Sequence, residues 1–387
     1  MSLAGVVPVR RERPHIVFLF SDTGGGHRSA ANAMIEALEL EYPGQTTQEM
    51  VDIFRQYAPP PFHRAPDIYP TLSRMPRVFG AGFHLSDGPR RTRLFYQMLW
   101  PYIRQGVQRL IAEHPADLIV SVHQLINAPM AWALARAEAQ TPFVTVVTDL
   151  VTTHAFWYSN RADRVIVPTD IAFQRGVKYG VAPERMTVIG LPVAERFCQP
   201  VGDPCAARQK LGWPQDRTVV LLVGGGEGMG PLELTARAID AARLPVALVI
   251  VAGRNHKLKE RLERYAWRTP TVVHGFVQEM PDFMRAADIL VTKAGPGTIC
   301  EAFIAGLPMI LYSRLNGQEE GNVDYVVDHG AGVWAPRPKE VVDALRRWLE
   351  HPAERQQAAQ VCRRLARPQA ARQIARLLMQ QICPQVD

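Results

Sequence analysis

The most informative stretch of this 387-residue chain, residues 293–330, combines groups that could bind phosphate with groups that could bind a sugar. The Gly-Pro-Gly turn at 295–297 predicts the start of a helix, and the free N–H groups at a helix N-terminus attract phosphate. After a predicted strand at Met309–Tyr312, a loop presents carboxylate and amide side chains, namely Gln318, Glu319, Glu320 and Asn322. Such groups suit the vicinal hydroxyls of a sugar because each can form two hydrogen bonds. We interpret this stretch as half of a nucleotide-sugar site.

A histidine ends the first glycine cluster. Asp22–His27 follows a predicted buried strand and precedes a predicted helix, and glycine lets a ligand approach the backbone closely. The dipole at a helix start disfavours a proton on imidazole, so His27 would be neutral at pH 7 and able to act as a general base. A helix-capping turn with an incidental histidine is the alternative. The cluster lacks both the Gly-Lys-Ser/Thr ending of a Walker A loop and the GxGxxG spacing of a dinucleotide site.

A second glycine cluster, Gly224–Gly230, could cradle phosphate or could serve only close backbone packing. The cluster occurs in the same half of the chain as the turn at 295–297, and this favours phosphate binding over close packing alone. Thr298 offers a hydroxyl donor to such a ligand, although capping the helix is an equally ordinary role. Glu301 could bind ribose hydroxyls, or it could be a favourable negative charge near a helix N-terminus.

Two further positions lie at predicted strand ends. His274–Val277 has the pattern of a strand end followed by a turn, where the backbone could pair with the edge of a base. Phe276 could stack there or belong to the core. Asp149 follows the predicted strand Phe143–Thr148 and precedes Thr152, Thr153 and His154. Polar clusters at the carboxyl end of a strand in an α/β domain favour a site over plain surface.

The sequence contains no Asp-x-Asp motif. Enzymes that hold a divalent ion on the diphosphate of a sugar nucleotide use paired carboxylates of this kind. We therefore expect neither a metal nor another cofactor, with helix dipoles and backbone amides stabilising the departing diphosphate.

The length of 387 residues suggests two or three domains, and the composition, with 47% hydrophobic and 21% charged residues, is that of a folded protein. No apolar run reaches the roughly 18 residues needed to span a bilayer, and no signal peptide or organelle transit segment is visible, so we expect a bacterial, cytoplasmic protein. The net charge of +7 suits nucleic acid, anionic lipid or solubility alone. Arg90, Arg91 and Arg93 flank an aromatic-rich stretch, which favours a membrane surface; no nucleic-acid-binding motif occurs.

Short apolar runs alternate with helical patterns along the chain, which predicts an α/β protein with parallel sheets. Because the strand–glycine–helix pattern restarts near residue 217, we expect two Rossmann-like, doubly wound domains that face each other across a ligand-binding cleft. The expected domains are residues 1–198 and 199–370. Residues 371–387 form a C-terminal helix that could pack back on the first domain. Residues 55–101 show no strand–helix rhythm and are predicted to be an irregular, functional insertion.

Several of these segments resemble one known family. SDTGGGHRSAANAMIEAL, VVTDL, the GGGEGMGP loop, TKAGPGTICEAFIAGLPMIL and NGQEEGNVDYVVDHGAGV are similar to segments of the monogalactosyldiacylglycerol synthases. These are two-domain, inverting glycosyltransferases with the GT-B fold. The wider group includes processive diacylglycerol glucosyltransferases and the N-acetylglucosaminyltransferase that forms lipid II. The resemblance spans roughly residues 14–365, and its most specific part is 293–330.

The resemblance implies a role for each matching residue. His27 would deprotonate the lipid hydroxyl, Phe276 would lie at the uracil, and Glu301 would bind the ribose. Gln318 and Glu319 would bind the hydroxyls of the sugar, with Asn322 close by. The glycine-rich turns and their neighbouring hydroxyl would hold the diphosphate: Gly26, Gly224, Gly225, Gly226, Gly297 and Thr298.

The resemblance also implies the reaction and its setting. Galactose would move from UDP-galactose to the sn-3 hydroxyl of 1,2-diacylglycerol with inversion, at an anionic membrane surface on the inner face of the cell membrane. The acceptor and membrane side would include Asp149, Trp157, Arg90, Arg91 and Trp100. UDP-glucose as donor, transfer of N-acetylglucosamine to a polyprenyl-linked acceptor, and a non-catalytic sugar-nucleotide sensor are the alternatives. Gln and Glu can bind an axial or an equatorial hydroxyl, so the residues themselves leave galactose and glucose open.

Overall fold

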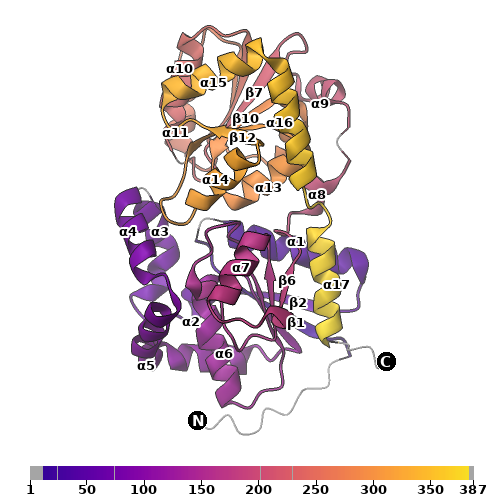
Figure 1. The fold of residues 1–387 in the computed structure, drawn as a ribbon. Coiled ribbons are helices and arrows are strands. Elements are labelled where there is room, and N and C mark those ends of the chain that lie inside the picture. The colour runs from indigo at the N-terminus through magenta and orange to yellow at the C-terminus, as the bar shows by residue number, and fades with distance from the viewer. Residues whose placement is uncertain (1–11, 24, 74, 201, 229, 383–387) are drawn as a thin grey trace. The chain divides into compact units, whose positions relative to one another are not determined.

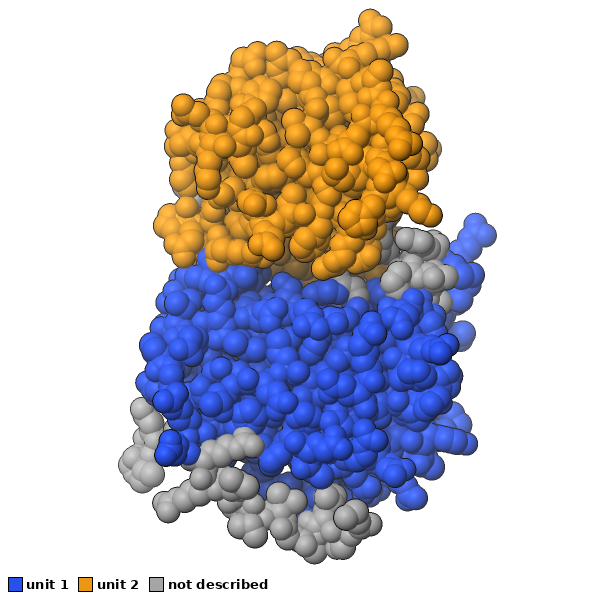
Figure 2. Space-filling model, turned by 180° about the vertical axis from the view of Figure 1, so that it is seen from behind, with its two compact units in different colours: residues 1–195, 369–387 blue, residues 196–368 orange. Residues whose placement is uncertain are grey.

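The computed structural model describes residues 12–382 except 24, 74, 201 and 229, and it leaves out the side chains of 70–73 and 76. The chain forms two compact units, residues 1–195 with 369–387 and residues 196–368 (Figures 1 and 2). The boundaries expected from the sequence, near 198 and 370, fall within a few residues of these positions.

The N-terminal unit contains a parallel six-stranded sheet with the order β2-β1-β3-β4-β5-β6. Its strands are apolar on both faces because helices cover both sides. The strands are β1 (His15–Phe20), β2 (Thr47–Asp52), β3 (Leu118–Ser121), β4 (Phe143–Val146), β5 (Arg164–Val167) and β6 (Met186–Val188).

Helices α1 (Gly26–Glu41) and α17 (Ala370–Ile382) cover one face of this sheet. Ile374 and Leu378 of α17 are fully buried against Phe18 and Met34, so the last helix belongs to the core of the first unit (Figure 1). The opposite face is covered by α6 (Asn127–Arg136), by α7 (Asp170–Lys178) and by the C-terminal part of α5 (Pro89–Glu113).

The stretch 55–101 is mostly helical, so the prediction of an irregular insertion is wrong. It contains the end of α2 (Ile53–Tyr57), then α3 (Ala65–Ser73), α4 (Pro76–Ser86) and the first half of α5. Its prolines concealed the helices in the sequence, yet Pro76 and Pro89 stand in first turns, where the missing N–H group costs nothing. Figure 1 shows α3, α4 and α5 together along one side of the unit.

The C-terminal unit contains a second parallel six-stranded sheet with the order β12-β11-β10-β7-β8-β9. Its strands are β7 (Thr218–Val223), β8 (Val246–Val251), β9 (Thr271–His274), β10 (Ile289–Lys293), β11 (Met309–Ser313) and β12 (Gly332–Trp334). One face is covered by α10 (Leu232–Ala241), α11 (His256–Glu263) and α15 (Pro338–Glu350). The remaining helices of this unit are α8 (Glu195–Cys198), α9 (Pro204–Leu211), α12 (Met280–Ala286), α13 (Pro296–Ala305), α14 (Glu320–Asp328) and α16 (Pro352–Leu365).

The strand order reverses once in each sheet, between β1 and β3 in the first and between β7 and β10 in the second. At such a point the following connections leave to opposite faces, and a crevice opens at the carboxyl ends of the strands. The residues predicted to carry chemistry in the glycine clusters follow β1 and β7, so each cluster lies at the reversal of its own sheet. Within the described part of the chain, no helix is long and apolar enough to cross a membrane.

Candidate functional site

His27 lies in the first turn of α1, at the strand-order reversal of the N-terminal unit. Gly25 precedes the helix with a φ of 77°, a left-handed conformation that glycine adopts without steric cost. Gly26 begins the helix and is exposed, so its backbone is open to a ligand. The turn therefore presents a half-buried imidazole next to accessible main chain.

The surroundings of His27 keep its imidazole neutral. Its Nδ1 atom lies 3.0 Å from the hydroxyl oxygen of Thr148, which follows β4. Burial lowers the pKa of His27 to about 4, and a hydrogen bond to the Val122 backbone only partly opposes this effect. At pH 7 the ring therefore has a lone pair available to accept a proton.

His123, which the sequence analysis missed, packs against His27 with ring centroids 4.6 Å apart. Its Nδ1 atom accepts a hydrogen bond from the Leu125 N–H at 3.3 Å, which leaves Nε2 as the protonated nitrogen, 3.3 Å from the Thr23 hydroxyl. Burial holds the pKa of His123 well below its ordinary value. Its place just after β3, the strand that pairs with β1, was the sequence signal that could have identified it.

Asp149 and Trp157 form a buried pair beside this histidine cluster. The Trp157 indole N–H donates to Asp149 Oδ2 at 2.6 Å, and the Trp157 ring lies 6.1 Å from that of His27. Because Trp157 is fully buried, it cannot contact a membrane surface, whereas its place on the acceptor side stays a prediction. Asp149 is buried too, and it holds the tryptophan that packs beneath the imidazole.

The other three residues predicted on the acceptor side lie on α5. Arg90 and Arg91 are exposed, and Arg91 donates to the backbone carbonyls of His84 and Asp87. Trp100 is half-buried, because it packs edge-on against Trp132 with ring centroids 5.7 Å apart. Trp100 therefore serves mainly to hold α5 on α6.

In the C-terminal unit, the glycine cluster after β7 forms a tight loop. A side chain at Gly224 would meet the backbone of Gly228, and Gly225 has a φ of 70°. The Gly226 carbonyl accepts from the Arg254 N–H at 2.8 Å, which fastens the loop to the end of β8. Close packing thus explains Gly224, whereas Gly225 and Gly226 present backbone at the carboxyl end of the sheet.

Helix α13 begins at the carboxyl end of β10, next to this loop. Gly297 and Thr298 lie in its first turn, where backbone N–H groups have no partner within the helix. Among the described residues, the Glu301 carboxyl group has no hydrogen-bond partner. Burial raises the pKa of Glu301 to about 7, while the charge of Arg196 opposes the shift. A half-buried carboxyl group one turn into the helix, without a hydrogen-bond partner among the described residues, suits a ligand with hydroxyl groups.

Phe276 is an exposed aromatic ring after β9, so it is not a core residue. The Arg254 guanidinium lies 4.4 Å from the centre of the Phe276 ring and forms an ion pair with Glu227 at 3.0 Å. Arg254, which sequence reasoning missed, thereby links the glycine loop to Phe276, the residue predicted to lie at the uracil. Aromatic and guanidinium planes both stack on nucleobases.

The loop before α14 exposes fewer polar side chains than the sequence predicted. Gln318 is half-buried there, but Glu319 is buried, and its carboxylate accepts from Lys293 Nζ at 2.7 Å and from the Leu315 N–H at 2.8 Å. Asn322 is also buried, and its amide donates to the Ala294 carbonyl at 2.9 Å. Asn322 therefore holds the turn between β10 and α13, and Lys293 is a further residue that the sequence analysis missed.

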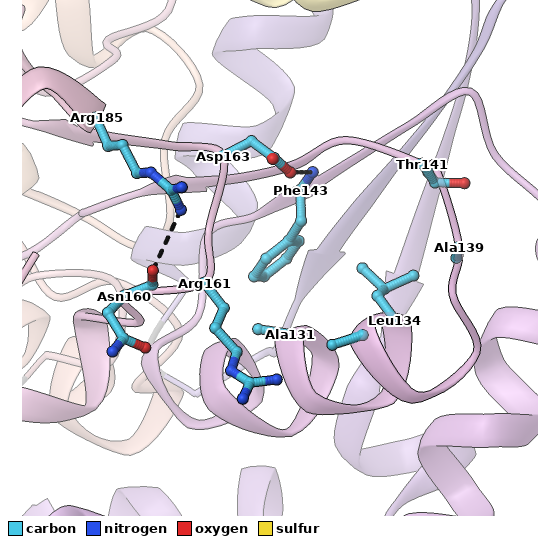
Figure 3. Close-up of a pocket in the computed structure, with 10 residues that line it drawn as sticks. Ala131, Leu134, Ala139, Thr141, Phe143, Asn160, Arg161, Asp163 and Arg185 are labelled. Atoms are coloured by element: carbon cyan, nitrogen blue, oxygen red, sulfur yellow. Dashed lines mark hydrogen bonds between the residues drawn. The ribbon is translucent and has the colours of Figure 1, made fainter. Parts of the chain in front are cut away.

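A separate cavity of about 430 Å³ lies at the opposite edge of the N-terminal sheet, near the amino ends of β4 and β5. Its polar groups serve the fold: Arg185 donates to the Asn160 carbonyl at 3.2 Å, and Asp163 accepts from the Phe143 N–H at 2.7 Å (Figure 3). This cavity contains none of the predicted site residues. In the range that the structure covers, no group of three or more His, Cys, Asp or Glu side chains is arranged to hold a metal ion.

Comparison with known families matches both units. Residues 27–193 match the family described as monogalactosyldiacylglycerol (MGDG) synthase, and residues 219–374 match the glycosyltransferase family 28 C-terminal domain. The chain is 38% identical over 369 residues to a probable monogalactosyldiacylglycerol synthase 2, chloroplastic, of Oryza sativa subsp. japonica, covering 92% of this chain and 78% of the relative. It is 35% identical to monogalactosyldiacylglycerol synthase 2, chloroplastic, of Arabidopsis thaliana, with the same coverage.

Among solved structures, MurG of Acinetobacter baumannii superposes with a TM-score of 0.61 at 16% identity, covering 95% of this chain and all of that one. Together with the two parallel six-stranded sheets, this similarity confirms the predicted GT-B fold class.

The raised pKa of Glu301 predicts how nucleoside binding depends on pH. With a pKa of about 7, Glu301 is mostly protonated at pH 6 and mostly ionised at pH 8. The ionised form accepts hydrogen bonds from two ribose hydroxyls, so uridine affinity should rise about tenfold between these values. Ligand-observed NMR titration with uridine avoids the ionisation of a phosphate. The Glu301→Gln variant should show no such rise, and an equal rise in both proteins would contradict the ribose role.

Proposed function

The chain belongs to the monogalactosyldiacylglycerol synthase family, and from this premise we propose the donor, the acceptor and the chemistry of its reaction. It is a hexosyltransferase that transfers galactose to diacylglycerol. We propose UDP-galactose as the donor and the sn-3 hydroxyl of 1,2-diacylglycerol as the acceptor. The observation that carries the mechanism is the place of His27 at the strand-order reversal, where its Nδ1 atom lies 3.0 Å from the Thr148 hydroxyl and burial lowers its pKa to about 4.

In the proposed reaction, His27 accepts the proton of the lipid hydroxyl while the hydroxyl oxygen bonds to the anomeric carbon of galactose. The bond between that carbon and the β-phosphate oxygen breaks, and its electron pair stays on the phosphate. Attack opposite the leaving group converts the α-linkage of the donor into a β-glycoside, and UDP departs. General-base catalysis of this kind contributes about 10²–10⁴-fold to a rate.

We propose that no metal ion takes part in this reaction. The chain has no Asp-x-Asp motif, so the negative charge of the departing diphosphate needs other groups. The backbone of Gly225 and Gly226 and the first turn of α13 offer N–H groups at the carboxyl ends of β7 and β10. Such preorganised donors stabilise developing charge in a site from which water is excluded.

We further propose that α3, α4 and α5 dock on an anionic membrane surface. Their exposed side chains combine apolar and basic groups, as membrane-surface helices do. The most exposed apolar ones are Leu85, Met98 and Tyr102, at 74%, 63% and 72%. Arg90 and Arg93 are exposed on the same helix as Met98 and Tyr102. The lipid acceptor would thus meet the N-terminal unit at the membrane.

An assay with purified protein and diacylglycerol vesicles tests the proposed reaction. UDP-galactose, UDP-glucose and UDP-N-acetylglucosamine are offered separately, and UDP-galactose should give the fastest transfer. His27→Asn should lower kcat by about 10²–10⁴-fold while UDP binding survives, because only the base is lost. The exposed His256 provides the control, and His256→Asn should keep the wild-type rate. Near-normal turnover in His27→Asn would show that His27 is not the base. Faster transfer from UDP-glucose would show that glucose, and not galactose, is the sugar transferred.

The membrane proposal predicts a charge-dependent loss of vesicle binding. Each surface arginine near an anionic bilayer contributes about 1 kcal/mol, so Arg90→Gln with Arg93→Gln should weaken binding to phosphatidylglycerol vesicles by about tenfold or more. Co-sedimentation at low and high salt measures the effect. A double variant of two exposed arginines in the other unit, Arg264→Gln with Arg346→Gln, is the charge-matched control. Equal losses in the two double variants would show that net charge, and not this surface, drives binding.

A further inference from the structure

We propose that Lys293 binds the diphosphate of the UDP-sugar through its ammonium group and that Glu319 positions it. The inference rests on the proposed function, because it assigns residues to the leaving group of that reaction.

The position of Lys293 in the sheet is the first argument. It is the last residue of β10, and β10 pairs with β7 at the strand-order reversal, with Thr292 beside Val223. The register between β10 and β11 shifts between Thr292 and Lys293. Irregularities of this kind re-aim a side chain near an active site. Lys293 thus emerges between the glycine loop that follows β7 and the turn that opens α13.

The glycines on both sides make room for this side chain. A Cβ atom at Gly225 would lie 3.1 Å from Lys293 Cε, and one at Gly295 would lie 2.9 Å from Lys293 Nζ. The ammonium group therefore lies against the two segments predicted to hold phosphate. Lysine is a common phosphate ligand because its ammonium group carries a compact positive charge and offers three N–H donors.

The donors of Lys293 are only partly used. Its Nζ atom donates to Glu319 Oε1 at 2.7 Å, and within the described chain no second partner is present. The side chain keeps 20% of its surface exposed. Two N–H donors thus remain for a ligand, next to the turn that opens α13.

Glu319 is placed to orient Lys293 and not to reach a sugar. Its side chain is only 4% exposed, and its two oxygens accept from Lys293 and from the Leu315 N–H. A carboxylate so buried is tolerated when it is both paired and hydrogen-bonded. Glu319 therefore acts through Lys293, and Gln318 is left as the reader of the sugar hydroxyls.

This assignment gives the leaving group a counter-charge. As the bond from the anomeric carbon to the β-phosphate oxygen breaks, its electron pair adds negative charge to UDP. Lys293 stabilises that charge by hydrogen bonding and keeps its own proton, while the proton of the acceptor hydroxyl goes to the base. No other reactant is needed.

Calorimetric binding of UDP and of uridine separates a phosphate ligand from a structural ion pair. Lys293→Met should weaken UDP binding at least tenfold and leave uridine binding unchanged, and Lys293→Arg should restore most of the UDP affinity. Lys210→Met removes an exposed lysine that pairs with Asp282 in the same unit at 3.0 Å, and it should bind UDP like the wild type. Equal UDP binding by Lys293→Met and the wild type would overturn the inference.

Glu319→Gln distinguishes positioning from sugar contact. If Glu319 positions Lys293, the variant weakens UDP binding, and the double variant with Lys293→Met is no weaker than Lys293→Met alone. If Glu319 instead contacts the sugar, the variant loses affinity for UDP-galactose but not for UDP, which would overturn the positioning role.

Chemical labelling tests the same point in the wild-type protein, without a variant that could misfold. UDP should protect Lys293 from an amine-acylating reagent, as followed by mass spectrometry, and uridine should not. Equal labelling with UDP at saturation would overturn the inference. A wild-type protein that binds neither UDP nor uridine would instead refute the proposed function itself.

Discussion

In each sheet of this protein the order of the parallel strands reverses once, and the reversal fixes where a ligand can meet the backbone. The hydrogen-bond ladder sets the two strand ends side by side, with Leu19 beside Ser121 in one sheet and Thr292 beside Val223 in the other. His27 follows the first of these pairs, and Lys293 extends the second. The positions of His27 and Lys293, the two principal groups of the proposed mechanism, are therefore set by the strand order of their sheets.

Burial then decides the charge of His27, and an ion pair decides the position of Lys293. His27 loses its proton because its surroundings cannot solvate an imidazolium, and a neutral ring can take the proton of an alcohol. Lys293 has its counter-charge in Glu319, whose carboxylate is only 4% exposed. A neutral imidazole suits the group that accepts a proton in the proposed displacement, and a positioned ammonium group suits the one that stabilises the departing phosphate.

The sequence predicted the two parallel sheets, the glycine turns and the helix start at His27, because these features are local: apolar runs, glycine clusters and a helix start are visible in adjacent residues. It missed His123, Arg254 and Lys293, whose roles arise only when strands distant in the sequence become neighbours. It also did not anticipate that Glu319 and Trp157 are buried. Glutamate and tryptophan are often found at binding surfaces, and the burial of these two follows from packing that no local sequence pattern reveals. The helices of 55–101 were hidden by their prolines, of which Pro76 and Pro89 stand in first turns while Pro101 lies inside α5.

The central claim is that His27 is a neutral base at physiological pH, and NMR of the free protein tests it directly. Carbon-13 labelling of the histidines, with His27→Asn to assign the resonance, follows the imidazole C–H shift of His27 between about pH 5 and 8. A pKa of about 4 predicts a shift that stays nearly constant above about pH 5.5. A full titration centred near the ordinary histidine value of about 6.5 would contradict the account.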